Sequence, residues 1–364
     1  MKIKDLINCI EKFAPHSLQE DYDNSGLLIG NADDETHAVL TTLDVTEEVM
    51  DEAIQLNANL IIAHHPIIFS GLKRINGTNY VERIIIKAIK HSIAIYACHT
   101  NIDNVFNGVN KKIADKLGLG KLKILQPKSN QLMKLVTFVP NDATSKVQQT
   151  LFDAGAGNIG NYSECSFLVN GEGSFKPNEM SNPFAGEKNK LEKVNENRLE
   201  VIFEAHKQHA VLHALKNAHP YEEVAYYLHC LENTYQNVGS GMIGEFEKPL
   251  KWKEFLQKVK EVFKVPTLKH TAKTSEEVKK IAFCGGSGSF LLKSAIQHKA
   301  DVFLSADFTY HKFFDADNKI VICDIGHFET EQFTPELFYD VIKENFPKFA
   351  VHLSKINTNP INYF

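Results

Sequence analysis

The sequence lacks the features that would place this chain in several large classes of protein. It has no long hydrophobic run, because the most apolar stretch, 60–69, is interrupted by His64, His65 and Pro66 and is too short to span a bilayer. Residues 1–10 mix charged and amide side chains with aliphatic ones and have no apolar core of the kind that a signal peptide needs. We therefore expect a soluble, cytoplasmic protein and no membrane partner.

An excess of basic residues is also absent. The 364 residues include 40 Lys and Arg against 45 Asp and Glu, which gives a formal net charge of −5. Proteins that bind nucleic acid through its phosphates usually carry a basic excess, so nucleic acid is not an expected partner. Hydrophobic residues make up 43% and charged residues 23%, which excludes wholesale disorder and, at this length, predicts about two or three domains.

The six cysteines contain no CxxC pair. A disulfide framework in so long a chain would require an oxidising compartment, and no other feature indicates one. Four of the cysteines lie in or beside strand-like runs, so we expect buried free thiols there: Cys98, Cys165, Cys284 and Cys323.

Hydrophobic periodicity divides the chain into a discontinuous domain and an insertion. Up to residue 124, strand patterns such as 60–63 and 93–97 alternate with helical ones, which favours an α/β domain with a mainly parallel sheet. The predicted order then changes to β-α-β-β-α-β, the ferredoxin-like motif, with a long polar loop at 171–197. The predicted bounds are 1–124 and 234–364 for the α/β domain and 125–233 for the ferredoxin-like insertion.

Three predicted strands of the α/β domain end in side chains that bind metals. Strand 60–63 leads into His64 and His65, strand 93–97 into His99 and Asp103, and strand 320–323 into His327 and Glu331. Ligands collect outside the carboxyl ends of strands in α/β sheets, and residues at i and i+4 share one face of a helix. Histidine and carboxylate without thiolate suit zinc, iron(II) or manganese. One such histidine alone would be read as a packed or surface residue, but the repeated arrangement predicts a metal site.

The tandem pair His64-His65 suits two ions rather than one. Adjacent side chains leave a strand end in different directions, so one imidazole can serve each ion. A carboxylate that bridges two ions about 3.5–4 Å apart is the usual device for generating a hydroxide nucleophile.

Three other segments carry less specific signals. Gly285–Ser289 follows a strand and precedes a helix, so its amides form either an anion cradle or a tight turn; it matches neither the GxGxxG nor the Walker pattern. Asp307 and His311 are either cleft residues or a helix cap and a surface histidine. Residues 219–223 contain potential ligands, but a proline-stiffened connection is the favoured interpretation.

Several ordered motifs make the sequence resemble the Nif-three-like family, whose members are commonly named GTP cyclohydrolase 1 type 2 homologues. The motifs are DNSGL at 23–27, IAHHPIIF at 62–69, HTNID at 99–103, AHPYEE at 218–223, CGGSGS at 284–289 and GHFETE at 326–331. The resemblance spans nearly the whole chain. It implies a toroidal homohexamer with a dinuclear metal site that faces the interior cavity, and an insertion similar to PII/CutA-like modules.

The resemblance also implies roles for individual residues. The expected ligands of two divalent ions, zinc first with iron or manganese as alternatives, are His64, His65, Asp103, His327 and Glu331, with Glu331 as a bridge. His99 is the expected catalytic residue, beside the ligands or in proton transfer. The chain departs from the family at Ser305-Ala306-Asp307, where Thr-Gly-Asp or Thr-Gly-Glu is frequent, and at Met242, where arginine is common. Neither departure removes a ligand, but both leave the substrate open.

The leading hypothesis is a metal-dependent hydrolase that acts on a nucleotide, with GTP cyclohydrolase chemistry. A metal-activated water would attack purine C8, open the imidazole ring and release formate. Two alternatives remain open at this point. The same ligands would serve a two-metal phosphoesterase or nucleotidase, and they would also serve a non-catalytic metal-binding regulatory scaffold in which the insertion gates the cavity.

Overall fold

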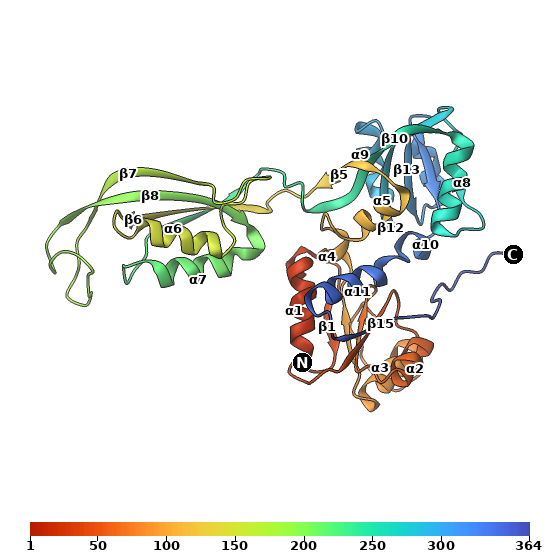
Figure 1. Ribbon diagram of the computed structural model, residues 1–364, viewed down its shortest axis with the longest axis horizontal. Coiled ribbons are helices and arrows are strands. Elements are labelled where there is room, and N and C mark those ends of the chain that lie inside the picture. The colour runs from red at the N-terminus through yellow and green to blue at the C-terminus, as the bar shows by residue number, and fades with distance from the viewer. The chain divides into compact units, whose positions relative to one another are not determined.

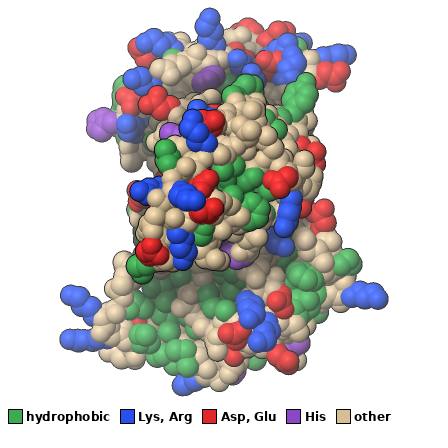
Figure 2. All heavy atoms as spheres, turned by 90° about the vertical axis from the view of Figure 1, so that its left-hand side faces the viewer, with side chains coloured by type: hydrophobic (Ala, Val, Ile, Leu, Met, Phe, Trp, Pro, Cys, Tyr) green, Lys and Arg blue, Asp and Glu red, His purple; other side chains and the backbone are tan.

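The computed structural model describes residues 1–364 and divides into two compact units (Figure 1). The first unit comprises residues 1–127 and 236–364, and the inserted unit comprises residues 128–235. None of the helices combines the length and the apolar character needed to cross a bilayer. On the face drawn in Figure 2, lysine and arginine side chains are interspersed with aspartate and glutamate rather than gathered in one basic patch.

The first unit contains a five-stranded sheet in the order β1-β4-β3-β2-β15. Its strands are β1 (Gly26–Ile29), β2 (Ala38–Thr42), β3 (Leu60–Ala63), β4 (Ala94–Ala97) and β15 (Ala350–Leu353). All neighbours run parallel except β1, which pairs antiparallel with β4. Strands β2, β3 and β4 are buried along their whole length. A strand buried on both faces has no polar alternation, which is why these segments appear in the sequence as short apolar runs.

Two pairs of helices cover this sheet (Figure 1). The helices α2 (Glu47–Gln55) and α3 (Tyr80–Lys90) pack on one face, where their apolar sides join the core around Leu40 and Ile61. The other face carries α1 (Ile3–Phe13) and α11 (Thr334–Asn345). There the hydroxyl of Thr41 donates a hydrogen bond to the backbone oxygen of Pro335.

The first unit also contains a six-stranded sheet in the order β11-β14-β13-β12-β10-β5. Its strands are β5 (Gly120–Pro127), β10 (Gly239–Lys251), β11 (Lys269–His270), β12 (Glu277–Ser287), β13 (Val302–Ala306) and β14 (Val321–Asp324). Only β12, β13 and β14 run parallel to one another. The short helices η3 (Ser289–Leu291), α9 (Leu292–Gln297) and η4 (Tyr310–Ala316) pack on one face. The helices α5 (Val109–Leu117) and α8 (Trp252–Phe263) cover the other.

The mainly parallel sheet expected up to residue 124 is present as the five-stranded sheet, but most strands after the insertion form a second sheet instead of extending the first. The chain forms β2, β3 and β4 before the insertion and β12, β13 and β14 after it, and each set pairs within itself. Periodicity shows that a segment is a strand but does not show which strand it will pair with.

The inserted unit is a four-stranded antiparallel sheet in the order β7-β8-β6-β9 with two helices. Along the chain its elements are β6 (Leu132–Pro140), α6 (Thr144–Asp153), β7 (Ser166–Phe175), β8 (Glu192–Glu204), the short η2 (Ala205–Lys207), α7 (Gln208–Ala218) and β9 (Tyr226–Leu231). Both helices share a core with one face of the sheet, formed by residues such as Leu135, Leu199 and Val201.

The predicted polar loop at 171–197 is too long. Its first five residues belong to β7 and its last six to β8, so the two strands continue as an antiparallel arm as far as the pair Phe175–Glu192. Residues 171–175 of β7 (Gly-Glu-Gly-Ser-Phe) are mostly small or polar and largely exposed, so this part of the strand has no apolar alternation that the sequence could reveal.

The cysteines form no disulfide bonds. Cys98, Cys284 and Cys323 are buried, as expected, but Cys165 is only partly buried.

Candidate metal centre

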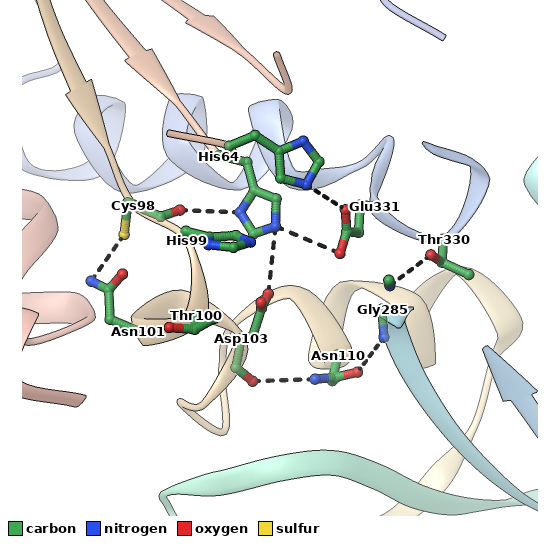
Figure 3. Close-up of polar contacts among 12 residues, drawn as sticks. His64, Cys98, His99, Thr100, Asn101, Asp103, Asn110, Gly285, Thr330 and Glu331 are labelled. Carbon is green, nitrogen blue, oxygen red and sulfur yellow. Dashed lines mark hydrogen bonds and ion pairs between the residues drawn. The ribbon is translucent and has the colours of Figure 1, made fainter. Parts of the chain in front are cut away.

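The three strand ends that the sequence singles out meet at one place in the first unit (Figure 3). His64 and His65 directly follow β3, and His99 precedes the short helix α4 (Thr100–Asp103) after β4. His327 and Glu331 are the first and last residues of α10 (His327–Glu331), which follows β14 in the other sheet. Metal-binding atoms lie within 4.8 Å of one another in three groups: His64 with His65 and His99; His65 with His327 and Glu331; and His64 with Asp103 and Glu331.

His64 is completely buried and has one ring nitrogen without a partner. Its Nδ1 lies 3.1 Å from the backbone oxygen of Cys98, which can only accept, so Nδ1 carries the proton. Its Nε2 points between Asp103 Oδ1 and Glu331 Oε1, each 3.7 Å away (Figure 3). Neither Nε2 nor Asp103 Oδ1 has a hydrogen-bond partner. Buried lone pairs without a partner are costly, so this group fits a cation.

His65 and His327 repeat the arrangement with carboxylates behind the rings. Nδ1 of His65 lies 2.7 Å from Asp44 Oδ1, and Nδ1 of His327 lies 2.6 Å from Asp307 Oδ2. Their Nε2 atoms lie 3.4 Å apart, and each is 3.0 Å from Glu331 Oε2. A carboxylate on Nδ1 fixes both the orientation and the tautomer of an imidazole whose other nitrogen binds a metal.

Glu331 is therefore shared, because Oε1 faces one group and Oε2 faces the other. The backbone beside it comes unusually close. Gly286 has a φ of +61°, and a Cβ built there would lie 2.3 Å from Glu331 Oε1. The Gly286 amide donates to Thr330 Oγ1 at 2.9 Å, and the Gly285 amide donates to Asn110 Oδ1 at 3.0 Å. Because side chains already occupy these two amides, the geometry disfavours an anion cradle at Gly285–Ser289. The segment instead ends strand β12, where the register with β13 shifts between Phe283 and Ser287.

His99 belongs to the group with His64 and His65 and to neither of the two groups that contain Glu331. Its ring centroid is 5.2 Å from that of His64 and 5.4 Å from that of His65. Its Nδ1 is 2.7 Å from Asp23 Oδ1, and Asp23 also accepts hydrogen bonds from the amide and hydroxyl of Thr100. Burial alone would raise the pKa of Asp23, but these hydrogen bonds from His99 and Thr100 hold it well below its usual value. Asp23 is thus a fixed negative charge behind His99.

Burial and neighbouring charges shift the pKa values of the titratable groups in the centre. Burial lowers the pKa of His64 to about 4, and burial together with the charge of Glu331 raises the pKa of Asp103 well above its usual value. Burial also disfavours charged His65 and His327, but their carboxylate partners raise their pKa values to about 10 and about 9. The metal-free centre therefore holds protons in the place where a cation would neutralise Glu331.

Several residues that support the centre were not found from the sequence. Asp44, which holds His65, lies just beyond β2 and also accepts a 2.6 Å hydrogen bond from the Thr358 hydroxyl. The strand-end rule that singled out His64 could have found Asp44. Asn110 connects the backbone oxygen of Asp103 to the Gly285 amide (Figure 3), and no pattern in the sequence marks it.

Of the weaker candidates from the sequence, one lies at the centre and the others do not. Asp307 lies at the centre as the partner of His327, whereas His311 is exposed on η4 and belongs to none of the three groups. His219 belongs to the inserted unit and is also outside these groups. Met242, at the position where the family often has arginine, is completely buried in β10.

An α/β unit with imidazoles and carboxylates at its strand ends defines a class of candidate metalloprotein, and comparison with known proteins gives the family. The family model Duf34/NIF3 (NGG1p interacting factor 3) matches residues 1–360, and the chain belongs to this family. This confirms the resemblance seen in the motifs.

Curated relatives and solved structures agree with this assignment. The chain is 40% identical over 363 residues to a "GTP cyclohydrolase 1 type 2 homolog" of Halalkalibacterium halodurans, which covers 98% of each chain. It is 38% identical to the protein of the same name in Bacillus subtilis, over 98% of this chain and 97% of the relative. A crystal structure described as a Bacillus cereus protein related to NIF3 superposes with a TM-score of 0.88 at 37% identity and covers 100% of this chain and 99% of the other.

Proposed function

We propose that the chain is a metal-dependent hydrolase whose centre holds two divalent ions. One ion would be bound by His64, Asp103 and Glu331, and the other by His65, His327 and Glu331. The observation that carries the proposal is the position of the Glu331 carboxylate, whose two oxygens face two separate sets of ligand atoms. Zinc is the first expectation for both ions, with iron or manganese as alternatives, because these metals share imidazole and carboxylate ligands.

The residues around the centre fit this assignment. His64 Nε2 and Asp103 Oδ1 are buried without hydrogen-bond partners, which is the state expected of ligand atoms before a cation binds. Two such ions supply an activated water and neutralise negative charge that develops on the substrate. The carboxylates of Asp44 and Asp307 keep the lone pairs of His65 and His327 directed at the centre. His99 is the proposed catalytic residue: with Nδ1 held by Asp23, its Nε2 is the atom that would exchange a proton with substrate or water.

The proposed substrate is a nucleotide, and GTP is the first to test. The support is the name of the relatives, "GTP cyclohydrolase 1 type 2 homolog". In that chemistry, one water would add to C8 of the purine and open the imidazole ring to a formamide. A second water would hydrolyse the formamide, break the remaining C–N bond to C8 and release formate.

Three further expectations stand as part of the proposal. The inserted unit, predicted from the sequence at 125–233, would have the ferredoxin-like fold, and its β-α-β-β-α-β order with β8 and β6 at the middle of the sheet supports this. The chain would assemble as a toroidal homohexamer, which the mass in solution by light scattering would test. It would act in the cytoplasm.

Metal content tests the proposal first. Elemental analysis of the purified protein should find close to two ions per chain, and Glu331→Gln, which keeps the volume but removes the charge, should lose most of them. Glu329→Gln is a matched control, because Glu329 is also a buried glutamate of α10 but bonds to Asn359 instead of facing the histidines. A wild-type protein that stays empty after exposure to zinc, iron(II) and manganese would refute the metal centre.

Product analysis then tests which reaction the metal-loaded protein catalyses, independently of whether the metal binds. Protein loaded with two ions should release formate from GTP, and the His99→Gln variant should keep its metal but lose turnover. Release of phosphate without formate would identify a phosphoesterase instead. A fully loaded protein that turns over neither bond would overturn the hydrolase assignment while leaving the metal centre intact.

A further inference from the structure

The inserted unit has its own pocket, of about 650 Å³, which the proposed hydrolase does not use. It lies on the side of the four-stranded sheet that α6 and α7 leave uncovered. Strand residues alternate between the two faces, and Leu135, Leu199 and Val201 point to the helices. Arg198, which precedes Leu199, therefore points to the other face. Phe138 and Val169 lie beside it in one row across the sheet, because Arg198 pairs in register with both. All three line the pocket.

Aromatic rings form two walls of this pocket. On the sheet, the rings of Phe138 and Tyr227 lie 5.8 Å apart, edge to face. On the opposite side, Phe184 from the segment between β7 and β8 lies 5.9 Å from Tyr221. Known small-molecule sites have about this volume and are lined mainly by apolar and aromatic side chains with a few polar groups.

The motif at 219–223 takes no part in the proposed metal centre. Its hydrogen bonds connect the parts of the chain that line this pocket. The ring of His219 contacts the backbone oxygen of Phe138 through Nε2 at 2.9 Å and accepts the Tyr221 amide at Nδ1 at 3.1 Å. Glu222 accepts a hydrogen bond from the Asn182 amide at 2.8 Å, which ties the segment between β7 and β8 to the motif. The pocket is thus bounded by bonded groups on the sheet, the motif and this segment.

Charge sets the kind of ligand that the pocket would take. Glu196 is only 9% exposed, and its one hydrogen bond comes from the Tyr221 hydroxyl to Oε1 at 2.8 Å. No lysine or arginine forms an ion pair with it. Among the other lining charges, Arg198 is paired with Glu200 at 2.7 Å and Glu172 with Lys193 at 2.7 Å. The lining acids that remain, Glu196, Glu222 and Glu223, outnumber the one remaining base, Lys176.

We propose that this pocket binds a small organic cation that carries an amine or ammonium group on an apolar body. Glu196 would supply the opposite charge, and the rings of Phe138, Tyr227 and Tyr221 would supply faces that attract a cation. The proposal is independent of the metal centre, which lies in the other unit, and it adds a ligand-binding function to the insertion.

Three probes that share one ring test the proposal on the full-length protein. Isothermal titration or ligand-detected NMR would compare benzyltrimethylammonium, benzyl alcohol and benzoate, which are cationic, neutral and anionic. The cation should bind at least about tenfold more tightly than the alcohol, and benzoate should bind most weakly. Equal binding of the three, preference for benzoate, or no binding of the cation would overturn the proposal.

Variants then connect binding to the pocket. Glu196→Gln keeps an acceptor for Tyr221 and should weaken binding of the cation about tenfold, whereas Glu164→Gln, an exposed site in the same unit, should leave it unchanged. Tyr227→Leu alters a ring that is 56% exposed, so the fold should tolerate it while affinity for the cation falls. Wild-type affinity in folded Glu196→Gln and Tyr227→Leu, with melting temperatures as the check on folding, would show that the cation binds elsewhere.

Discussion

Replacement of Gly286 by alanine should weaken metal binding at the proposed centre although it replaces none of the proposed ligands. The new Cβ would lie 2.3 Å from Glu331 Oε1 and 3.2 Å from His327 Cε1, whereas real Cβ contacts are essentially never shorter than 3.0 Å. The difference, 3.0 minus 2.3, means that the carboxylate or the end of β12 must move by about 0.7 Å. Displacement of groups that orient metal ligands typically costs about 10–100-fold in affinity, and we expect a loss of that size.

Substitution of a second glycine, Gly118, is a control that distinguishes the effect of this close contact from the effect of backbone strain. Gly286 has a φ of +61° and Gly118 a φ of +74°, so alanine at either position should cost about 1 kcal/mol of stability for the left-handed conformation. A Cβ at Gly118 meets no atom within 4 Å. Gly118→Ala should therefore lose stability in urea unfolding but keep its metal affinity, measured by competition with a chromophoric chelator. If Gly286→Ala binds zinc as wild type does, or if both variants lose affinity equally, the reasoning about the close contact is wrong.

Three further predictions use the same chelator titration. Asp44→Asn should weaken metal binding about 10–100-fold, because an amide that donates to Nδ1 would place the proton of His65 on Nε2; unchanged affinity would contradict this. Thr358→Val should have a smaller effect, about threefold, since Asp44 loses one hydrogen bond but keeps His65; a loss as large as that of Asp44→Asn would count against it. Affinity should rise from pH 6 to pH 9, because a metal must displace protons from the centre. Burial lowers the pKa values of His65 and His327, but their carboxylate partners outweigh it and raise them to about 10 and about 9. A pH-independent affinity would exclude this linkage.

Local sequence patterns predicted the helices and strands that have a clear hydrophobic periodicity or that end at a clear change from apolar to polar residues. Strand β3 has its predicted bounds of 60–63, and β4 and β14 lie within one residue of the predicted ranges 93–97 and 320–323. Strand β10 was missed because its glycines and Pro249 interrupt the pattern that strands usually show. Pairing into two sheets was missed for a different reason, since the choice of partner depends on contacts between distant segments.

The candidate metal centre likewise combines residues that local patterns reveal with residues that only the three-dimensional fold brings together. Its strand-end histidines could be found because each follows an apolar run, and Asp103 and Glu331 because each lies four residues after a histidine. Asn110 has no such relation to its partners, Asp103 and Gly285, because the bridge it forms exists only once α5 packs beside β12. Its role could be seen only in three dimensions.

The inserted unit is attached to the first unit at two points that lie side by side, and this bears on how the chain could have evolved. Pro127, the last residue of β5, pairs in register with Gly239, the first residue of β10, so the chain leaves the first unit and returns to it at neighbouring points of two antiparallel strands. A turn of a few residues could close the same two strands. An ancestor without the insertion would thus need no change in any strand of the sheet or in any ligand. The geometry at this point therefore permits gain or loss of the inserted unit without a change in the residues of the candidate metal centre.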